Sequence, residues 1–410
     1  MKKKIIYCAI IMLFLVSCKK QVHEYIETID LSNVTDSTFM LSEIADSIVY
    51  YPLPSIKSKT YTTEIEVLEK FIYSFHSHHL YKYERKSLQL LDSIYLGGPM
   101  EGPGYTPFKM ITNTAFPFGQ DELFICPRRT ESGNNVCYSS ATLNTSTKEW
   151  QDNITFPNYD FTQINEYITD FGYCLEKTIF RIDTLKWFDK NMQCLKEEIL
   201  DTVLTRPYPG PKNCITLLHD KIYYHAPTSS TIYEISPKHA PIPLYKFRLG
   251  KYQTDYKEFS DFQFGKVGYY RENAFNHSPH YHLRGAQISE QFIWGTFHYK
   301  GNLFGFLFNK TQKGIHILPV KAEFQALPIE EGGLTNDLDG GMDFWPRRIS
   351  KKGEIYTWYD VEDLKYKVSQ SRSNQIKNPE AAKRLKKMLD NLPENIRTII
   401  AVLKEKNNSL

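Results

Sequence analysis

The residues with the clearest potential for chemistry lie in the segment Asn336–Arg348, which reads NDLDGGMDFWPRR. Asp337, Asp339 and Asp343 place three carboxylates within seven positions, and carboxylate oxygens are preferred ligands of Ca²⁺. The spacing D-x-D-G-G-x-D lacks the distal bidentate glutamate of an EF-hand. The alternative is turn chemistry, in which aspartates accept backbone N–H bonds and the Gly-Gly pair supplies positive φ. We interpret the segment as a turn and keep calcium binding as the alternative.

A second group of candidate ligands is the histidine run HSPHYH, with His277, His280 and His282. These imidazoles could hold Zn²⁺ if a loop folded them inward. No carboxylate base stands at a diagnostic offset, so we favour a solvated histidine-rich insertion and keep His280 and His282 as the zinc candidates. The sequence also contains no GxSxG, Walker or GxGxxG motif. It therefore names no catalytic residue.

The N-terminus carries a sorting signal. Three lysines precede the apolar run Ile5–Val16, which at about 12 residues is too short to span a bilayer as a stable helix. The run ends in Leu-Val-Ser-Cys18, which resembles a bacterial lipobox, where the cysteine becomes the lipid-bearing N-terminus. We therefore predict a signal peptide over residues 1–17, acyl chains on Cys18 that bind the membrane, and a polar tether over 18–40. An ordinary secretory signal is the alternative.

The residues after Cys18 bear on location. No aspartate follows the cysteine to signal inner-membrane retention, so we predict an outer-membrane lipoprotein. The segment KKQVHEYIE has only scattered acids, which favours the periplasmic face over the cell surface. The whole chain carries a net charge of +3, and loss of three signal-peptide lysines leaves a neutral chain. A neutral surface gives no reason to expect nucleic-acid binding.

Internal repetition predicts the architecture. Six strand-rich units have their centres near residues 72, 124, 173, 223, 294 and 356, and each begins with a polar turn. Units of this length, with four strands each, match the blades of an all-β, six-bladed β-propeller over residues 41–377. A pair of β-sandwiches is the alternative. Residues 378–410 read as a short helix from Pro379 and a closing strand, with Ser47–Pro54 as the strand's partner.

The opening segment can be placed in this scheme. A hairpin turn at Ser350–Gly353 makes Trp345–Ile349 the inner strand of a blade, with Phe344 and Trp345 packed between blades. The aspartate loop then becomes one of the connections that cross from blade to blade around a central channel. We expect these connections to gather the candidate ligand-binding residues on one face: Glu101, Tyr105, Tyr159, Arg206, Tyr208, Tyr270, Arg271, Asp337, Asp339 and Trp345.

Four motifs together resemble a known family. They are LSEIADSIVYYPLP at 41–54, YLGGPMEGPGYTPF at 95–108, NDLDGGMDFWP at 336–346 and ENIRTIIAVLKEK at 394–406. They resemble the six-bladed β-propeller lipoproteins of Bacteroidota, which are similar in layout to TolB-like and NHL-type propellers. The resemblance covers roughly residues 40–405. It implies a fold and an envelope location but no activity.

Two classes of function remain open. The first is a non-catalytic binding or assembly lipoprotein whose aromatic and arginine residues hold a peptide, a glycan or a partner protein, since these side chains often anchor interfaces. The second is a propeller hydrolase or lyase with a metal near the channel mouth, held by His280, His282 or the Asp337/Asp339 loop. We favour the first class, and we predict no cofactor, with calcium or zinc as the alternative.

Overall fold

The computed structural model of the chain describes residues 26–32, 38–54, 64–76, 79–95, 116–118, 120–132, 135–156, 164–169, 172–179, 182–188, 194–201, 215–219, 221–225, 230–250, 282–299, 302–321, 331–371 and 375–406. Cys18, the histidine run up to His280 and most of the predicted crossing segments lie outside this part of the chain. His282 is described only as a backbone position in a strand.

The described strands form six sheets, and most neighbours within a sheet are consecutive in sequence and antiparallel. The first three sheets contain β3 (Glu64–Val67), β4 (Phe71–His76), β5 (His79–Glu84), β6 (Leu90–Tyr95); β7 (Phe116–Phe118), β8 (Gln120–Ser132), β9 (Asn135–Asn144), β10 (Trp150–Phe156); and β11 (Ile164–Thr169), β12 (Gly172–Ile179), β13 (Ile182–Phe188), β14 (Cys194–Asp201). The fourth and fifth contain β15 (Ile215–Leu218), β16 (Lys221–Tyr224), β17 (Thr231–Ser236), β18 (His239–Arg248), with β1 (Glu27–Asp30); and β19 (His282–Ile288), β20 (Phe292–Tyr299), β21 (Asn302–Asn309), β22 (Ile315–Lys321), β23 (Glu331–Gly332). The sixth, the closing sheet, contains β24 (Arg348–Ile349), β25 (Ile355–Asp360), β26 (Ile396–Glu405) and β2 (Ala45–Pro54).

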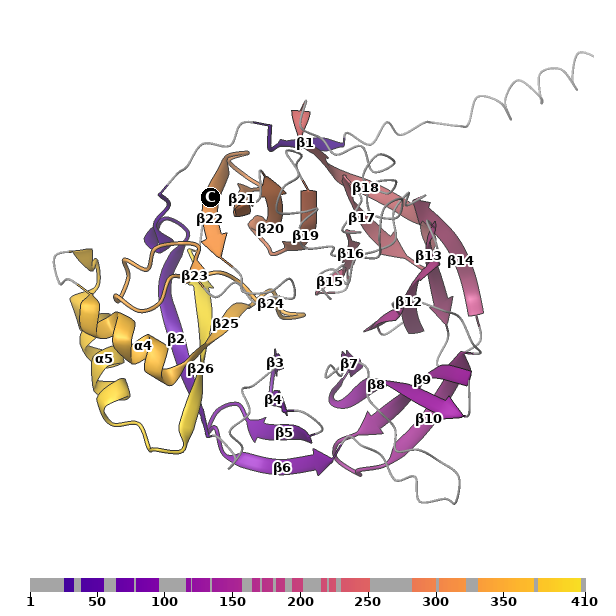
Figure 1. Cartoon of the computed structure of the whole chain (residues 1–410), viewed down its shortest axis with the longest axis horizontal. Coiled ribbons are helices and arrows are strands. Elements are labelled where there is room, and N and C mark those ends of the chain that lie inside the picture. The colour runs from indigo at the N-terminus through magenta and orange to yellow at the C-terminus, as the bar shows by residue number, and fades with distance from the viewer. Residues whose placement is uncertain are drawn as a thin grey trace, which may run out of the picture.

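The sheets stand in a ring, the arrangement of a β-propeller (Figure 1). The six repeat units predicted from the sequence fall one per sheet, each in the second strand: β4, β8, β12, β16, β20 and β25. The expected four strands are found in every sheet, and two sheets have one strand more. Four sheets have four strands, whereas the fourth and fifth have five. The extra strands, β1 and β23, cover the outer edges of β18 and β22, and an unpaired edge is a liability for aggregation.

Both ends of the chain meet in the closing sheet. β2 pairs antiparallel with β26 from Ala45 opposite Glu405 to Pro54 opposite Ile396, as the sequence predicts. β26 is rich in β-branched residues, and Ile399–Val402 are fully buried. Because β26 also pairs with β25, the last strand of the chain has a neighbour on each side.

The N-terminal segment differs from the tether predicted over residues 18–40. Glu27–Asp30 form β1, which pairs in parallel with the end of β18, and Leu31 donates its N–H to the Arg248 carbonyl at 2.9 Å. Ile29 and Leu31 are buried between the fourth and fifth sheets. The chain then reaches the closing sheet through the short helix η1 (Leu41–Glu43). Ile29 and Leu31 alternate with polar residues, and their burial holds this segment at the outer edge of the fourth sheet.

Two helices lie outside the closing sheet (Figure 1). The predicted helix from Pro379 is α5 (Pro379–Asp390), with Asn378 accepting the Ala381 N–H at its N-terminus. α4 (Val361–Gln370) was not predicted: residues up to 377 were assigned to strands and turns. Asp360 caps α4 by accepting the Glu362 N–H. Neither helix, nor any other in the described residues, is long and apolar enough to cross a membrane.

Candidate functional site

The aspartate segment fills the seam between the fifth sheet and the closing sheet. Leu334 and Phe344 exchange both backbone hydrogen bonds, at 2.9 and 2.8 Å, and so close a loop that contains all three aspartates. Gly333 has φ +105° and a β-carbon there would lie 2.6 Å from the Phe344 carbonyl oxygen, so only glycine fits this corner. Gly340 has φ +75°, whereas Gly341 has no positive φ and is restricted by the Tyr50 hydroxyl. The predicted positive φ therefore applies to one glycine of the pair.

Asp337 is buried and binds the N-terminal segment. Its Oδ1 accepts the Ser42 backbone N–H at 2.9 Å, and its Oδ2 accepts the Ser42 hydroxyl at 2.6 Å. Lys377, in the segment before α5, forms an ion pair with Oδ2 at 3.1 Å. Burial acts to raise the pKa of Asp337, but the bonds from Ser42 and Lys377 outweigh it and the pKa is lowered. This carboxylate joins two distant parts of the chain to the loop.

Asp339 lies two residues further on in a different environment. Its Oδ1 accepts the Asn336 amide at 2.8 Å, the Gly341 N–H at 3.1 Å and the Tyr50 hydroxyl at 3.2 Å. These donors are all neutral, so burial prevails and raises the pKa of Asp339. Asp343, nearer the end of the loop, pairs with Lys367 of α4 at 3.3 Å.

The three aspartates thus do not converge. Each has its own protein partners, and the described residues contain no group of three or more acidic, histidine or cysteine side chains arranged to hold a metal ion. The exposed fractions of Asp337 and Asp339 are 7% and 4%. They lie inside the seam because η1 and the segment before α5 cover the loop, with the Leu41 N–H bonded to Thr335 and the Asn378 N–H to Leu338. The expectation that they line an open channel face is corrected accordingly.

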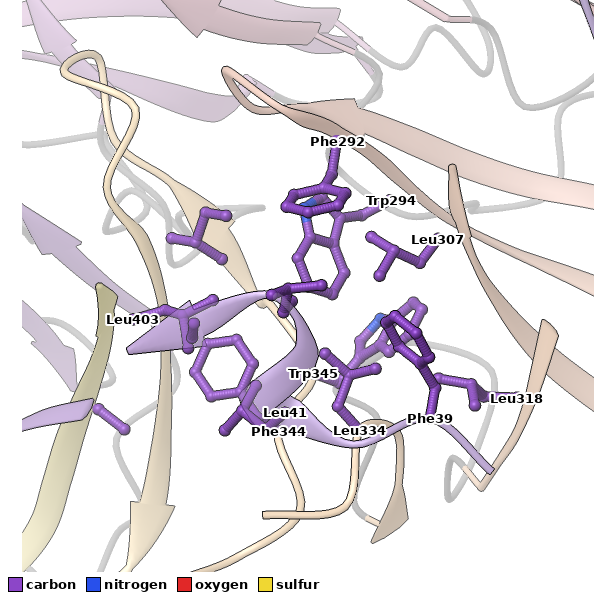
Figure 2. Packing of buried hydrophobic residues seen from close by; sticks show 14 of the residues in the cluster. Phe39, Leu41, Phe292, Trp294, Leu307, Leu318, Leu334, Phe344, Trp345 and Leu403 are labelled. Carbon is purple, nitrogen blue, oxygen red and sulfur yellow. The ribbon is translucent and has the colours of Figure 1, made fainter. Parts of the chain in front are cut away.

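Trp345 is the large side chain that fills the seam between the fifth sheet and the closing sheet. Figure 2 shows its indole beside Trp294 of β20, with ring centroids 5.5 Å apart and planes at 85°. The ring also lies directly against Gly305 of β21, where a β-carbon would collide with it. Trp345 is 7% exposed, so it does not line a channel face either. Phe344 belongs to the same cluster, which confirms packing between sheets but not the predicted inner strand, since β24 begins only at Arg348.

A polar cluster that the sequence reading missed joins the closing sheet to the first sheet. Arg348 donates to Glu64 at 3.0 Å, and its Nε lies 3.7 Å from Glu66. Tyr356 donates its hydroxyl to the Ile65 carbonyl and to Glu66, both at 3.2 Å. Burial raises the pKa of Glu66 although Arg348 opposes the shift. The signal was the alternation in Glu64-Ile-Glu66, which puts both carboxylates on one face of a strand.

Another carboxylate, partly buried, lies between the closing sheet and the fifth sheet. Glu405, the last residue of β26, accepts a 3.3 Å hydrogen bond from the Ser289 hydroxyl between β19 and β20. Burial raises its pKa to about 7, with Glu290 adding to the shift and Lys310 opposing it. Glu405 accepts a hydrogen bond from a hydroxyl and lies between two sheets. It is therefore an acid that loses its proton near pH 7.

The other candidate residues belong, by their sequence positions, to the connections between sheets. Seven of them lie outside the described residues: Glu101, Tyr105, Tyr159, Arg206, Tyr208, Tyr270 and Arg271. Their flanking strands are described, however. Each connection between sheets starts at the end of an outer strand and leads to the start of the next inner strand, so all of them leave from the same face of the ring.

Solved structures of other proteins resemble this chain in fold. A crystal structure of a putative exported protein from Bacteroides fragilis NCTC 9343 matches with a TM-score of 0.60 at 12% sequence identity, over 93% of this chain and all of that chain. The fold is a β-propeller. At that identity the match speaks for the fold alone.

Other solved propellers are more distant. An oligogalacturonate lyase in complex with manganese gives a TM-score of 0.39 at 8% identity, over 82% of this chain and 74% of that chain. A prolyl endopeptidase gives 0.37 at 11% identity, over 75% of this chain and 45% of that chain. No family model matches the sequence, and no curated protein matches it.

Proposed function

We propose that this chain is a cell-envelope lipoprotein whose propeller is a non-catalytic binding module for a peptide, a glycan or a partner protein. The observation that carries the proposal is topological: every connection between sheets leaves from one face, on a ring that β2 and β26 close. Those connections contain tyrosines and arginines, the side chains that most often anchor interfaces. We also infer that all six sheets are blades, which fits the motifs shared with six-bladed Bacteroidota lipoproteins.

The contrast with the described polar residues supports a binding role elsewhere. Asp337, Asp339 and Arg348 are buried and hydrogen-bonded to other parts of the chain, so their role is to hold the ring together. A rigid scaffold with variable connections on one face is the usual way in which folds present a binding surface.

The test is a thermal melt of the mature protein with defined probes: envelope oligosaccharides, and a library of short peptides. A ligand that binds only the folded state raises the melting temperature. Arg206→Ala and Tyr270→Ala should abolish this shift and leave the melting temperature of the free protein unchanged. Mass spectrometry of each stabilising probe after incubation separates the two classes of function, because a cleaved or eliminated probe would make the protein a hydrolase or lyase.

Location is tested separately. We place the protein in the outer membrane, on its periplasmic face, held by lipid on Cys18. Labelled palmitate should enter the wild type and not Cys18→Ala, which should be released or remain unprocessed. Equal labelling of both proteins would exclude the anchor, and protease protection in intact cells distinguishes the periplasmic face from the cell surface.

A further inference from the structure

The short turns of the sheets lie together on one face of the ring, which we call the turn face. It comprises the described turns that join the first to the second and the third to the fourth strand of a sheet, opposite the connections between sheets. These turns bind one another across the seams. Arg85 forms two hydrogen bonds with Glu354, at 2.7 and 2.8 Å, and Lys352 pairs with Glu69 at 2.8 Å.

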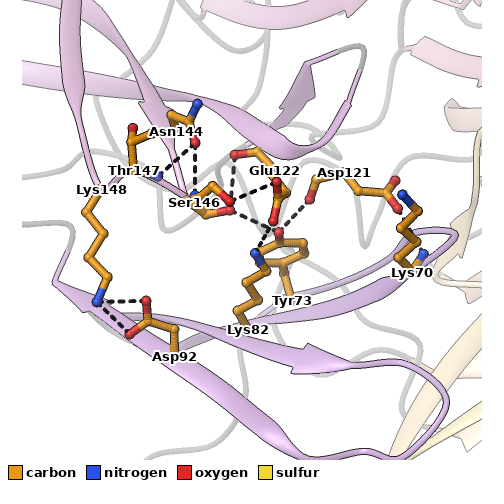
Figure 3. Close-up of polar contacts among 11 residues, drawn as sticks. Lys70, Tyr73, Lys82, Asp92, Asp121, Glu122, Asn144, Ser146, Thr147 and Lys148 are labelled. Atoms are coloured by element: carbon orange, nitrogen blue, oxygen red, sulfur yellow. Dashed lines mark hydrogen bonds and ion pairs between the residues drawn. The ribbon is translucent and has the colours of Figure 1, made fainter.

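Figure 3 shows this face where the first and second sheets meet. The Lys70 N–H, between β3 and β4, donates to Asp121 at 2.9 Å, and Lys148, between β9 and β10, pairs with Asp92 at 2.8 Å. Across the ring, the His219 N–H donates to the Lys351 carbonyl at 2.6 Å. Among the described residues, these contacts therefore link the closing sheet to the first and fourth sheets, and the first sheet to the second.

β1 begins on the side of the turn face. It runs parallel to β18, which starts at the turn containing Lys238, so Glu27 is the end of β1 nearer to that turn. Glu27 also pairs with Lys313, in the turn between β21 and β22, at 2.7 Å. At the other end of β1, an ion pair with Arg248 lowers the pKa of Asp30 to about 2. Both ends of β1 are thus attached to the ring.

This attachment shortens the tether. Only the eight residues 19–26 separate Cys18 from β1, and a fully extended chain of that length reaches roughly 28 Å at most. A ring of about 380 residues has a radius of gyration of about 21 Å, so the tether is shorter than the body is wide. A body on so short a tether cannot turn over freely at a bilayer.

Charge on the turn face agrees with a lipid surface. The described turns contain nine lysine or arginine residues and four glutamates. Some of these cations pair with carboxylates of neighbouring strands, such as Lys148 with Asp92 and Lys313 with Glu27. Six of the lysines are exposed: Lys70, Lys86, Lys148, Lys238, Lys313 and Lys352. Basic residues near an anionic bilayer are attracted to its headgroups.

We infer that the turn face lies against the lipid bilayer and that the face with the connections between sheets points away from it. The inference rests on the proposed lipid anchor. It assigns the ring an orientation: the turns contact phospholipid headgroups, and the connections face the aqueous compartment where a ligand would arrive.

Lysine acetylation of the bilayer-bound protein tests this orientation. The acylated protein is reconstituted into phosphatidylethanolamine–phosphatidylglycerol vesicles, and modification rates are read by mass spectrometry against the same protein in detergent. Lys70, Lys86 and Lys352 should react at least about threefold more slowly on the bilayer. Lys383 and Lys386 of α5 are the matched controls, since α4 and α5 lie in the chain between the end of β25 and the start of β26, both opposite the turns, and their rates should not change.

A second arm separates this inference from the anchor. The mature chain carrying Cys18→Ser and an N-terminal histidine tag is bound to nickel-chelating lipid, which replaces acylation. The same protection pattern is expected there, even if palmitate labelling shows that Cys18 is not acylated in cells. Equal protection of turn-face and α5 lysines, or protection of α5 alone, in either arm would overturn the orientation. Loss of protection on phosphatidylcholine vesicles would assign it to charge rather than to the tether.

Discussion

The closing sheet meets its two neighbours through seams of different construction. Toward the first sheet, side chains of the strands pack directly, with Tyr356 and Trp358 against Ile65 and Val67, and Arg348 pairs with carboxylates across the seam. Toward the fifth sheet, a loop and part of the N-terminal segment are inserted, and Trp345 supplies the bulk. One seam is closed by complementary strands and the other by added chain.

The difference shows that the departures from the regular repeat are concentrated in the seam with the fifth sheet. Side chains of the first sheet and the closing sheet contact each other directly, and Arg348 is buried there with Glu64 and Glu66. The seam with the fifth sheet contains small residues such as Gly305, and the space beside it is filled by an aromatic ring. Both seams must be closely packed, without voids. The seam with the first sheet is filled by side chains of the strands themselves, and the seam with the fifth sheet by side chains of an inserted loop.

Removing the strand common to both seams should have the largest effect. Deletion of Ile396–Leu410 eliminates β26 and leaves β2 and β25 with unpaired edges. We expect loss of the cooperative thermal transition and aggregation on size exclusion. Deletion of residues 407–410 alone is the control and should melt like the wild type. A long truncation that kept its melting temperature would contradict closure by β26.

Trp345→Ala should be the most damaging point change in the loop-filled seam. Emptying a buried tryptophan site costs about 3–5 kcal/mol in the free energy of unfolding. Trp345→Phe should recover part of that loss, because a ring still faces Trp294. Urea denaturation measures both variants. A loss below about 1 kcal/mol in the free energy of unfolding of the alanine variant would mean that Trp345 does not stabilise this seam.

Arg348→Met tests the polar seam. It leaves Glu64 and Glu66 without their cation, and breaking a buried pair costs about 3–5 kcal/mol; we expect about 2–4 kcal/mol, since the three side chains keep 11–19% exposure. Arg348 opposes the rise in the pKa of Glu66, so without it that pKa rises further, and the loss should shrink as the pH falls through the folded value of Glu66. Adding Glu64→Gln and Glu66→Gln should restore stability at pH 7. If the triple variant stayed as unstable as the single one, charge would not be the cause.

Glu405→Gln should stabilise the protein at high pH. The pKa of Glu405 is raised to about 7 from 4.5, so the folded state binds this proton more tightly than the unfolded state. The buried carboxylate therefore begins to destabilise the fold above pH 4.5 and does so fully above pH 7. We expect the variant to gain about 1–3 kcal/mol at pH 8 and nothing at pH 4. Chemical denaturation at the two pH values measures it, with the exposed Glu394→Gln as the control.

The two buried aspartates should respond differently to removal of charge. In Asp337→Asn the Oδ2 that accepts Ser42 and Lys377 is lost, and we expect a cost of about 1–2 kcal/mol. In Asp339→Asn all three observed bonds can be kept, because they end on Oδ1. Since burial raises the pKa of Asp339, that variant should match or exceed the wild type at pH 7. Thermal melts in parallel decide.

The same melts test the calcium alternative. EDTA should leave the melting temperature of the wild type unchanged, because each aspartate is bound by protein groups. A large EDTA shift that vanished in Asp339→Asn would restore the metal interpretation of the loop.

The sequence predicted those parts of the fold that repeat or that carry strong local signals. Units such as the one around Tyr73 recur with similar turns, and the β-branched run after Ile396 indicates a strand. α4 escaped notice because its apolar residues Val361, Leu364 and Val368 follow an aromatic strand without a break. Its N-terminal cap at Asp360, followed by Glu362 and Asp363, was a local signal that could have found it.

The environment of the aspartate loop could not be predicted. The turn chemistry was legible in Asn336, Asp339 and Gly340, but burial depends on residues almost 300 positions away, such as Ser42, and these leave no mark on the local pattern. β1 was hidden for the same reason: four mostly polar residues pair with a strand more than 200 positions later. The hydrogen bonds within the loop can be predicted from its sequence, whereas the distant segments that bury the loop cannot.

The attachment of the N-terminal segment bears on how the protein is made. β1 and β2 leave the ribosome before their partners, because β1 pairs with β18 and β2 pairs with β26, the last of the described strands. Contacts this far apart in sequence slow folding, and they leave strand edges open to aggregation meanwhile. The ring therefore closes only after the whole polypeptide has been made, and until then β1 and β2 are without their partners.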